Sequence, residues 1–401
     1  MCGRARLLTD GEDIVDFTLT DREREWVELG RTLAAEFAPR AARWDSEAAY
    51  PEENHKRLGE LGLLGAALPV DFGGGGASLV ECYLLVEEIS KACANTALLV
   101  HDQNVSGRIL ATYGGPGHRE ILERLAAGTA EVTIAMTEPQ AGSALYELTT
   151  TARRDGDEWV VDGGKTYNSF GDRAAAHLVY ARFAEAGSAP SSGPEGIGIV
   201  LVDAHREGVS TTPMGRKLGM RGVEEVHLHF DGVRVPAANV VIEGRAGSTE
   251  GFTRPLEVYN ATRVGMGVMA LGIAQGAMDV AIAHLRTRRQ FGRRLADFQG
   301  LQWMLADAAV AVEGARLLCY RALAEVDAGR TSAYHSACAK VAATEGAFRV
   351  VDDCLQMLGG AGYFAEAPLE RMLRDVRMFK ITGGTTQILK NTIGRALVGR
   401  P

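Results

Sequence analysis

The chain has 401 residues, of which 46% are apolar and 23% are charged. This length allows two or three domains with a large buried core, and the composition is typical of a soluble globular protein. Because 43 Lys+Arg stand against 51 Asp+Glu, the net charge is −8. That balance argues against a nucleic-acid-binding protein that relies on bulk positive charge.

The cysteines and the longest uncharged window indicate where in the cell the protein is expected. The six cysteines form no CxxC pair, which favours a reducing cytoplasm over a disulfide framework or a zinc site. The first residues, MCGRARLLTDGED, lack the apolar core of a signal peptide. The longest uncharged window, 264–278, is shorter than the ~20 residues of a membrane span. We therefore expect a cytoplasmic protein with no membrane contact.

After a tail over 1–16, the segment 17–130 has a helical pattern. The stretch REWVELGRTLAAEFAPRAARW places apolar residues three and four apart, as in an amphipathic helix. The glycine run in PVDFGGGGAS interrupts this pattern before the helical period resumes. No GK[ST] follows the run, so an inter-helix turn is favoured over a phosphate loop. The segment is predicted to be an α-helical domain.

The segment 131–244 changes to a period of two. TTTARRDGDEWVVDGGKTY predicts a strand, an Asp155–Gly156 turn and a second strand, and further alternating stretches follow. Several short strands without intervening helices indicate an antiparallel, barrel-like sheet. His227 and His229 share one face of a strand, but no third ligand is evident, so solvent-facing histidines are favoured over a metal site.

From 245 to 401 the helical period returns, with room for four or five helices. Five arginines lie within 286–294. They fit either a solvated helix end terminated by Gly292 or a phosphate clamp, and spacing does not separate the two. Glycine breaks in QMLGGAGY and TGGTTQ let the backbone approach a ligand closely. A phosphate-bearing cofactor accounts for all three features.

Four motifs, in order, resemble signatures of the acyl-CoA dehydrogenase family. They are AMTEPQAGSA (135–144), RRQFGRRLADFQ (288–299), QMLGGAGY (356–363) and GGTTQI (383–388). The resemblance covers nearly the whole chain. It implies an α+β multidomain fold: an N-terminal α-helical domain, a middle antiparallel β-barrel-like domain and a C-terminal four-helix bundle. It also implies FAD at a subunit interface of a homo-oligomer, with a tetramer expected.

Matching positions to the family assigns cofactor roles residue by residue. The resemblance places Tyr167 against the isoalloxazine ring and Ser169 near flavin N5. It places Arg288 and Gln290 at the pyrophosphate, with Phe291 beside them. The remaining FAD contacts that it implies are Thr137, Ser143, Gln356, Gly359, Gly360, Thr385 and Gln387. It places Arg263 at the mouth of the acyl pocket.

The carboxylate base of the family is missing. The family removes a proton next to a thioester carbonyl while Cβ delivers hydride to flavin N5, which requires a positioned base. Most members carry a glutamate in the turn that here reads Thr-Gly-Gly-Thr, so glycine fills the base position at Gly383 and enlarges the acyl pocket. A second subgroup uses the residue before Arg263, here Thr262. Asp102 is the candidate replacement base, and an ordinary polar helix residue is the alternative. Glu257, about 1.4 turns from Thr262 on a helix, is expected to point elsewhere.

The resemblance therefore implies an FAD-dependent oxidation of an acyl thioester at Cα–Cβ. Two other readings stay open: another flavin reaction on the same fold, such as a monooxygenase, and an accessory subunit without its own base. The thioester is either acyl-CoA or an acyl-carrier protein. Glu224 and Glu225 are awkward beside a nucleotide phosphate and so favour a carrier arm. An electron-transfer flavoprotein is a possible acceptor. No metal site is expected.

Overall fold

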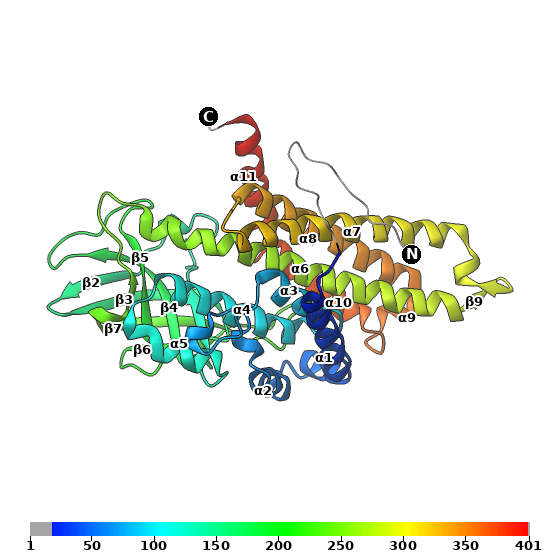
Figure 1. Ribbon diagram of the computed structural model, residues 1–401, viewed down its shortest axis with the longest axis horizontal. Coiled ribbons are helices and arrows are strands. Elements are labelled where there is room, and N and C mark those ends of the chain that lie inside the picture. The colour runs from blue at the N-terminus through cyan, green and yellow to red at the C-terminus, as the bar shows by residue number, and fades with distance from the viewer. Residues whose placement is uncertain (1–17, 400–401) are drawn as a thin grey trace.

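The computed structural model describes residues 18–399, and the predicted N-terminal tail at 1–16 lies outside these described residues. Figure 1 shows an elongated molecule. A β-sheet lies at one end, long helices run to the opposite end, and a group of shorter helices packs along their middle. The expected order of a helical, a β and a second helical segment is confirmed.

The N-terminal helices begin at well-formed caps. Thr20 and Ser78 each accept a hydrogen bond from the backbone of a glutamate three residues on, Glu23 and Glu81, and each glutamate side chain bonds back. Both are capping boxes. The predicted glycine turn before the third helix is confirmed, because Gly73 and Gly76 adopt positive φ. The helices are α1 (Asp21–Ser46), α2 (Glu52–Glu60), α3 (Leu79–Ala92), α4 (Ala94–Tyr113) and α5 (Arg119–Ala126).

The middle strands form one sheet in the order β6-β7-β3-β2-β4-β5-β8, with β1 paired to β4. The predicted Asp155–Gly156 turn joins β2 to β3. The sheet is not purely antiparallel, however, because β1 and β2 both pair parallel with β4. After the β2–β3 hairpin the chain returns on the far side of β2, which fixes this direction. The strands are β1 (Val132–Ala135), β2 (Thr151–Asp155), β3 (Glu158–Ser169), β4 (Ala176–Ala184), β5 (Ile197–Asp203), β6 (Val209–Pro213), β7 (Glu225–Pro236) and β8 (Val240–Ile242).

The C-terminal helices pack around α6. By length and composition α6 is the one described helix apolar enough to span a membrane, but 72% of that apolar stretch is buried inside the protein, as in a core helix. The helices are α6 (Glu250–Thr287), α7 (Gln299–Asp327), α8 (Ala333–Leu358), α9 (Gly360–Tyr363), α10 (Leu369–Val376) and α11 (Thr386–Val398).

The arginine-rich segment forms a hairpin, which corrects the helix-end interpretation. Helix α6 ends before Gly292, and β9 (Arg289–Gln290) pairs antiparallel with β10 (Arg293–Arg294). The two turn residues, Phe291 and Gly292, have φ of 49° and 79°, as a two-residue type I′ hairpin requires. This hairpin lies at the end of the long helices opposite the sheet (Figure 1).

Glycines on α6 let the N-terminal helices approach it closely. A Cβ at Gly265 would lie 2.3 Å from the Tyr83 ring, and one at Gly272 would lie 2.4 Å from the Glu87 carbonyl oxygen. The apolar side chains of α3, α4, α6 and α8 therefore form one continuous core. This packing fixes α4, which carries Asp102, against α6, which carries Arg263.

Candidate active site

A buried ion pair holds the loop of the first signature against the end of β3. Lys165 Nζ lies 2.7 Å from Glu138 Oε1, and both side chains are buried. Thr149 and Thr150 also donate hydrogen bonds to the carboxylate. Burial lowers the pKa of Lys165 to about 8. Burial alone raises the pKa of Glu138, but the Lys165 ammonium and the threonine donors lower it overall to about 2, so the pair is ionised at neutral pH. Thr137 is thereby fixed beside β3.

Tyr167 presents an uncovered aromatic ring. Its side chain is 67% exposed, although its neighbours Thr166 and Asn168 are buried. Its φ is 54°, a left-handed conformation that is uncommon outside glycine and concentrates at functional sites. Thr166 N donates to Thr137 O over 2.9 Å, which places Thr137 at this ring. The pair therefore borders a surface on which a planar group can stack.

Ser169 is hydrogen-bonded to a buried carboxylate that sequence reasoning placed elsewhere. Ser169 Oγ donates to Glu225 Oε1 over 3.0 Å, and Lys217 Nζ lies 3.6 Å from the same oxygen. The second oxygen, Oε2, is buried without a partner. Burial raises the pKa of Glu225 above its usual value, and the neighbouring Lys217 offsets only part of this increase. Since Glu225 points inward and only Glu224 is exposed, the charge argument for a carrier-protein arm is weakened.

Asp102 lies where the three segments meet. It is partly buried on α4. Burial, and to a smaller extent Glu225 and Glu131, together raise its pKa to about 8. The phenol of Tyr259, on α6, interacts electrostatically with both Asp102 and Arg263. Asp102 is therefore close enough to Glu225 and Tyr259 for their charges to interact, and Tyr259 interacts in turn with Arg263.

Arg263 connects this cluster to the glycine turn. Its Nε donates to Gly383 O over 3.2 Å, and its Nη1 donates to Asn260 Oδ1 over 2.7 Å. Lys340, fully buried on α8, donates to Thr382 O and Gly384 O over 2.7 and 2.6 Å. Three successive carbonyl groups of the turn thus face two cations. Sequence reasoning missed Lys340, because no local pattern distinguishes it from an ordinary helix lysine.

The two usual base positions offer no acid. Gly383 has φ of 66°. Thr262 is buried, and its hydroxyl donates to Val258 O of its own helix. Glu257 is exposed and influences Tyr113 rather than Arg263.

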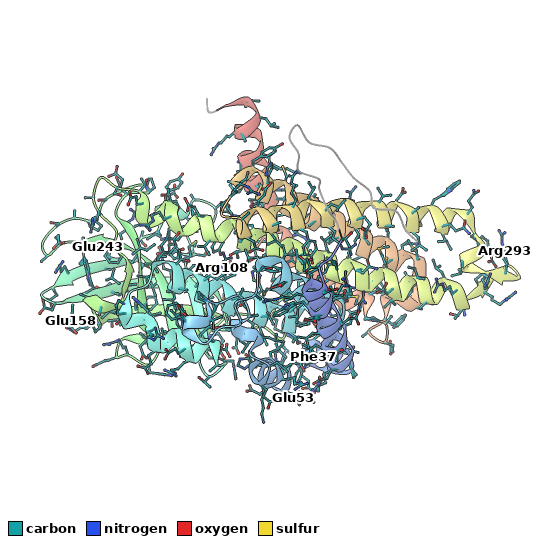
Figure 2. The ribbon with its side chains drawn as sticks, in the orientation of Figure 1. Phe37, Glu53, Arg108, Glu158, Glu243 and Arg293 are labelled. Carbon is teal, nitrogen blue, oxygen red and sulfur yellow. The ribbon has the colours of Figure 1, made fainter. Side chains whose placement is uncertain are left out.

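The assigned residues fall into two separated groups. Tyr167, Ser169, Asp102 and Arg263 belong to the central group, together with the 382–385 turn that Thr385 ends as the N-cap of α11. Figure 2 labels Arg293 at the far tip, well away from the sheet end marked by Glu158 and Glu243. The exposed residues of the hairpin and of the α8 end form the distal group: Arg288, Gln290, Phe291, Gln356, Gly359 and Gly360. Of the other assigned residues, Ser143 and Gln387 are exposed.

The central group fits one end of a flavin. The uncovered Tyr167 ring, the Ser169 hydroxyl and the orphaned Glu225 Oε2 offer a stacking face and polar contacts for a ring with donors and acceptors at its edge. The distal group adds guanidinium donors of the kind that bind a pyrophosphate. One chain does not bring the two groups together.

These features define a class: a three-part α-β-α flavoprotein whose acyl site lies between its parts. Comparison with known proteins gives the family. Residues 20–129, 133–233 and 249–398 match the N-terminal, middle and C-terminal domains of acyl-CoA dehydrogenase. The chain belongs to the acyl-CoA dehydrogenase family.

Similarity to individual proteins supports this family assignment. A 3-sulfinopropanoyl-CoA desulfinase from Paraburkholderia xenovorans is 40% identical, over 96% of this chain and 98% of its own. The structure of butyryl-CoA dehydrogenase from Megasphaera elsdenii superposes with a TM-score of 0.90 at 29% identity, covering 96% of this chain and 100% of that one. A Mycobacterium smegmatis glutaryl-CoA dehydrogenase in complex with FADH2 gives 0.88 at 28% identity, covering 95% and 96%. The chain is an FAD-dependent oxidoreductase of acyl thioesters.

Proposed function

We propose that this protein oxidises an acyl-CoA at Cα–Cβ with Asp102 as the base in place of the family glutamate. The observation that carries the proposal is that Asp102, partly buried on α4, lies within electrostatic range of Glu225 and Tyr259, while Gly383 and Thr262 supply no acid. Bound FAD supplies the hydride acceptor. The Asp102 carboxylate accepts the α-proton, and α4 holds it in place against α6.

The residues around Asp102 divide the remaining tasks. Tyr167 and Thr137 border the flavin ring, and Ser169 with Glu225 contacts its edge. The 382–385 turn, held by Arg263 and Lys340, forms the opposite wall. Packing of these parts excludes water from the acyl group, which strengthens each electrostatic contact.

A second copy of the chain completes the cofactor site in this proposal. The distal group, carried by the β9–β10 hairpin and the end of α8, binds the pyrophosphate and adenosine of FAD held by the central group of a neighbour. The 93% exposed Phe291 at the hairpin tip supports a contact with another protomer. A homotetramer is the assembly we propose.

The proposal also covers the thioester carrier, the electron acceptor and the location of the protein. Acyl-CoA is favoured over a carrier-protein thioester because Glu225 is only partly exposed and is bonded to Ser169. An electron-transfer flavoprotein serves as electron acceptor. The described cysteines, Cys82, Cys93, Cys319, Cys338 and Cys354, are free thiols, which supports a cytoplasmic location.

Anaerobic reduction of the flavin tests the proposal. Purified protein loaded with FAD is mixed with a panel of acyl-CoA thioesters, and the absorbance of oxidised flavin is followed. We expect bleaching with at least one thioester and a loss of at least a hundredfold in its rate for Asp102→Asn, the size of a general-base contribution. Unchanged bleaching in Asp102→Asn removes Asp102 as the base. No bleaching with any thioester contradicts the oxidation.

One observation favours a second function. The missing glutamate accompanies 36–40% identity to four proteins named 3-sulfinopropanoyl-CoA desulfinase. For this chain, such a reaction breaks the Cβ–S bond of a β-sulfinate thioester and consumes one water. Carbon is reduced to the saturated acyl group, and sulfur leaves as sulfite, so no external electron acceptor is needed. Release of sulfite from 3-sulfinopropanoyl-CoA without net flavin bleaching identifies this function.

A further inference from the structure

Arg263 is a partly buried cation whose protein partners are neutral. Its guanidinium bonds to Asn260 Oδ1 and Gly383 O and lies 5.8 Å from the centre of the Tyr259 ring. Burial lowers its pKa from an ordinary value so high that the group stays charged at neutral pH. Among residues 18–399, no carboxylate lies within ion-pair distance of it, and its Nη2 has no acceptor.

Lys340 brings a second positive group to the same turn. Its ammonium bonds only to the carbonyl oxygens of Thr382 and Gly384. Burial and, to a smaller extent, the nearby Arg263 together lower its pKa to about 7. Throughout the described part of the chain, Lys340 likewise has no ion pair. The turn that carries the base in relatives is therefore flanked here by two cations and no anion.

Such an arrangement is costly unless an anion binds. A buried charge without a partner is strongly unfavourable, and proteins normally pair it. Glycine at 383 provides no carboxylate to pair with Arg263, and it leaves room beside the arginine. A Cβ at this position would lie 3.5 Å from Met266 Cγ and 4.0 Å from Arg263 Cγ, which are ordinary contact distances. A substrate group can therefore enter where a side chain is missing.

We propose that Arg263, supported by Lys340, binds an oxyanion carried by the acyl chain, a carboxylate or a sulfinate. The free Nη2 and the second N–H of Nη1 form a fork that matches two oxygens of such a group. This inference rests on the proposed function, because it requires acyl thioesters to bind in the same site. It extends that function by selecting acidic acyl groups over alkyl groups of equal length.

Among residues 18–399, the acidic group of Asp102 influences Tyr259 and not Arg263. The acidic groups that influence Asp102 are Glu225 and Glu131, and Asp102 itself influences Tyr259. An oxyanion at Arg263 therefore meets no ion-pairing carboxylate among the described residues. The substrate is oriented with its acidic end at the glycine turn and its reacting carbons nearer α4.

Binding of matched thioesters tests the inference. FAD-loaded protein is titrated with butanoyl-CoA, pentanoyl-CoA, glutaryl-CoA and 3-sulfinopropanoyl-CoA under anaerobic conditions, and Kd is taken from calorimetry as well as from the flavin spectrum. We expect the two acidic thioesters to bind at least tenfold more tightly than the neutral ones. Arg263→Gln removes this preference, and Arg263→Lys keeps part of it. The exposed Arg124→Gln on α5 is the matched control for loss of one positive charge and leaves the preference intact.

Gly383→Glu provides a test that keeps Arg263 in place. The new carboxylate neutralises the arginine, so the preference for acidic thioesters is lost while neutral ones still bind. Equal affinity for acidic and neutral thioesters in the unmodified protein overturns the inference and leaves the proposed oxidation standing. A preference that survives in both Arg263→Gln and Gly383→Glu also overturns it. If no thioester binds or reduces the flavin, both the inference and the proposed function fall.

Discussion

At Asp102, burial and two neighbouring carboxylates act in the same direction. Burial, then Glu225, then Glu131 raise its pKa to about 8, close to the value at which a general base is effective near neutral pH. Only the deprotonated carboxylate accepts a proton. We therefore expect the rate of flavin reduction, measured as a function of pH by anaerobic stopped flow, to rise as pH increases through about 8. A profile that is flat between pH 6 and 9 contradicts this assignment.

The same shift has a consequence for stability. Because the pKa of Asp102 is higher in the folded than in the unfolded chain, the folded state binds more protons between pH 4 and 8, and stability falls as pH rises through that window. Asp102→Asn removes this term. The variant should gain thermal stability over the unmodified protein as pH rises from 4 to 8, and the difference should stay constant above 8. Calorimetric scans across this range measure it, and a gain that shrinks with pH is incompatible with a raised pKa.

Substitution of Glu225 should change the pKa of Asp102 while Asp102 itself stays unaltered. Since Glu225 raises the pKa of Asp102, Glu225→Gln should shift the pH profile of flavin reduction toward lower pH. Its exposed neighbour Glu224 does not contribute to Asp102, so Glu224→Gln is the matched control with an unchanged profile. If both variants shift the profile equally, the effect is a general change of charge and the specific coupling is absent.

Among the elements, the end of β3 depends on one buried ion pair. Glu138→Gln leaves the Lys165 ammonium buried without its counter-charge, and breaking such a pair costs about 3–5 kcal/mol. We expect Glu138→Gln to lower the free energy of unfolding by this amount in urea titrations and to weaken FAD binding through displacement of Thr137. The double variant Glu138→Gln with Lys165→Met should recover much of the loss, because no unpaired charge remains. Equal destabilisation in the single and double variants would show that charge pairing is not the cause.

The order of elements was predictable from periodicity, but several pairings were not. Apolar spacing identified the helices and the β2–β3 hairpin because both depend on residues close in sequence. The parallel pairing of β1 and β2 with β4 depends on where distant strands meet. The segment of the β9–β10 hairpin fitted either a helix end or a phosphate clamp by its sequence, and no hairpin was predicted there, because a Phe-Gly turn gives a weaker signal than Asn-Gly.

The candidate site shows the same division. Motif matches named Tyr167, Ser169, Arg263 and the glycine turn, each within a short stretch of sequence. The contact of Ser169 with Glu225 and of Lys340 with the turn join residues far apart in the chain. No local pattern reports such contacts, so the inward position of Glu225 and the cation pair emerged only from the fold.

For the whole molecule, the two groups of cofactor residues lie in separate parts of a single chain. The β9–β10 hairpin and the sheet are at opposite ends of the long helices (Figure 1). In the proposed oligomer, symmetric association would place the distal group of one chain at the central group of another. A variant in one group and a variant in the other should therefore complement each other.

Tyr167→Asp alters the central group, and Arg288→Glu alters the distal group. Neither variant alone should retain FAD, since every site in its oligomer contains one altered group. When the two chains are produced together, a mixed pair forms one site with both groups altered and one site with both intact. With random pairing, about a quarter of the FAD content of the unmodified protein should return, measured by flavin absorbance per chain in the total co-produced protein, without selection for mixed oligomers. If Arg288 served the FAD of its own chain, mixing would restore nothing, and the shared cofactor site would be wrong.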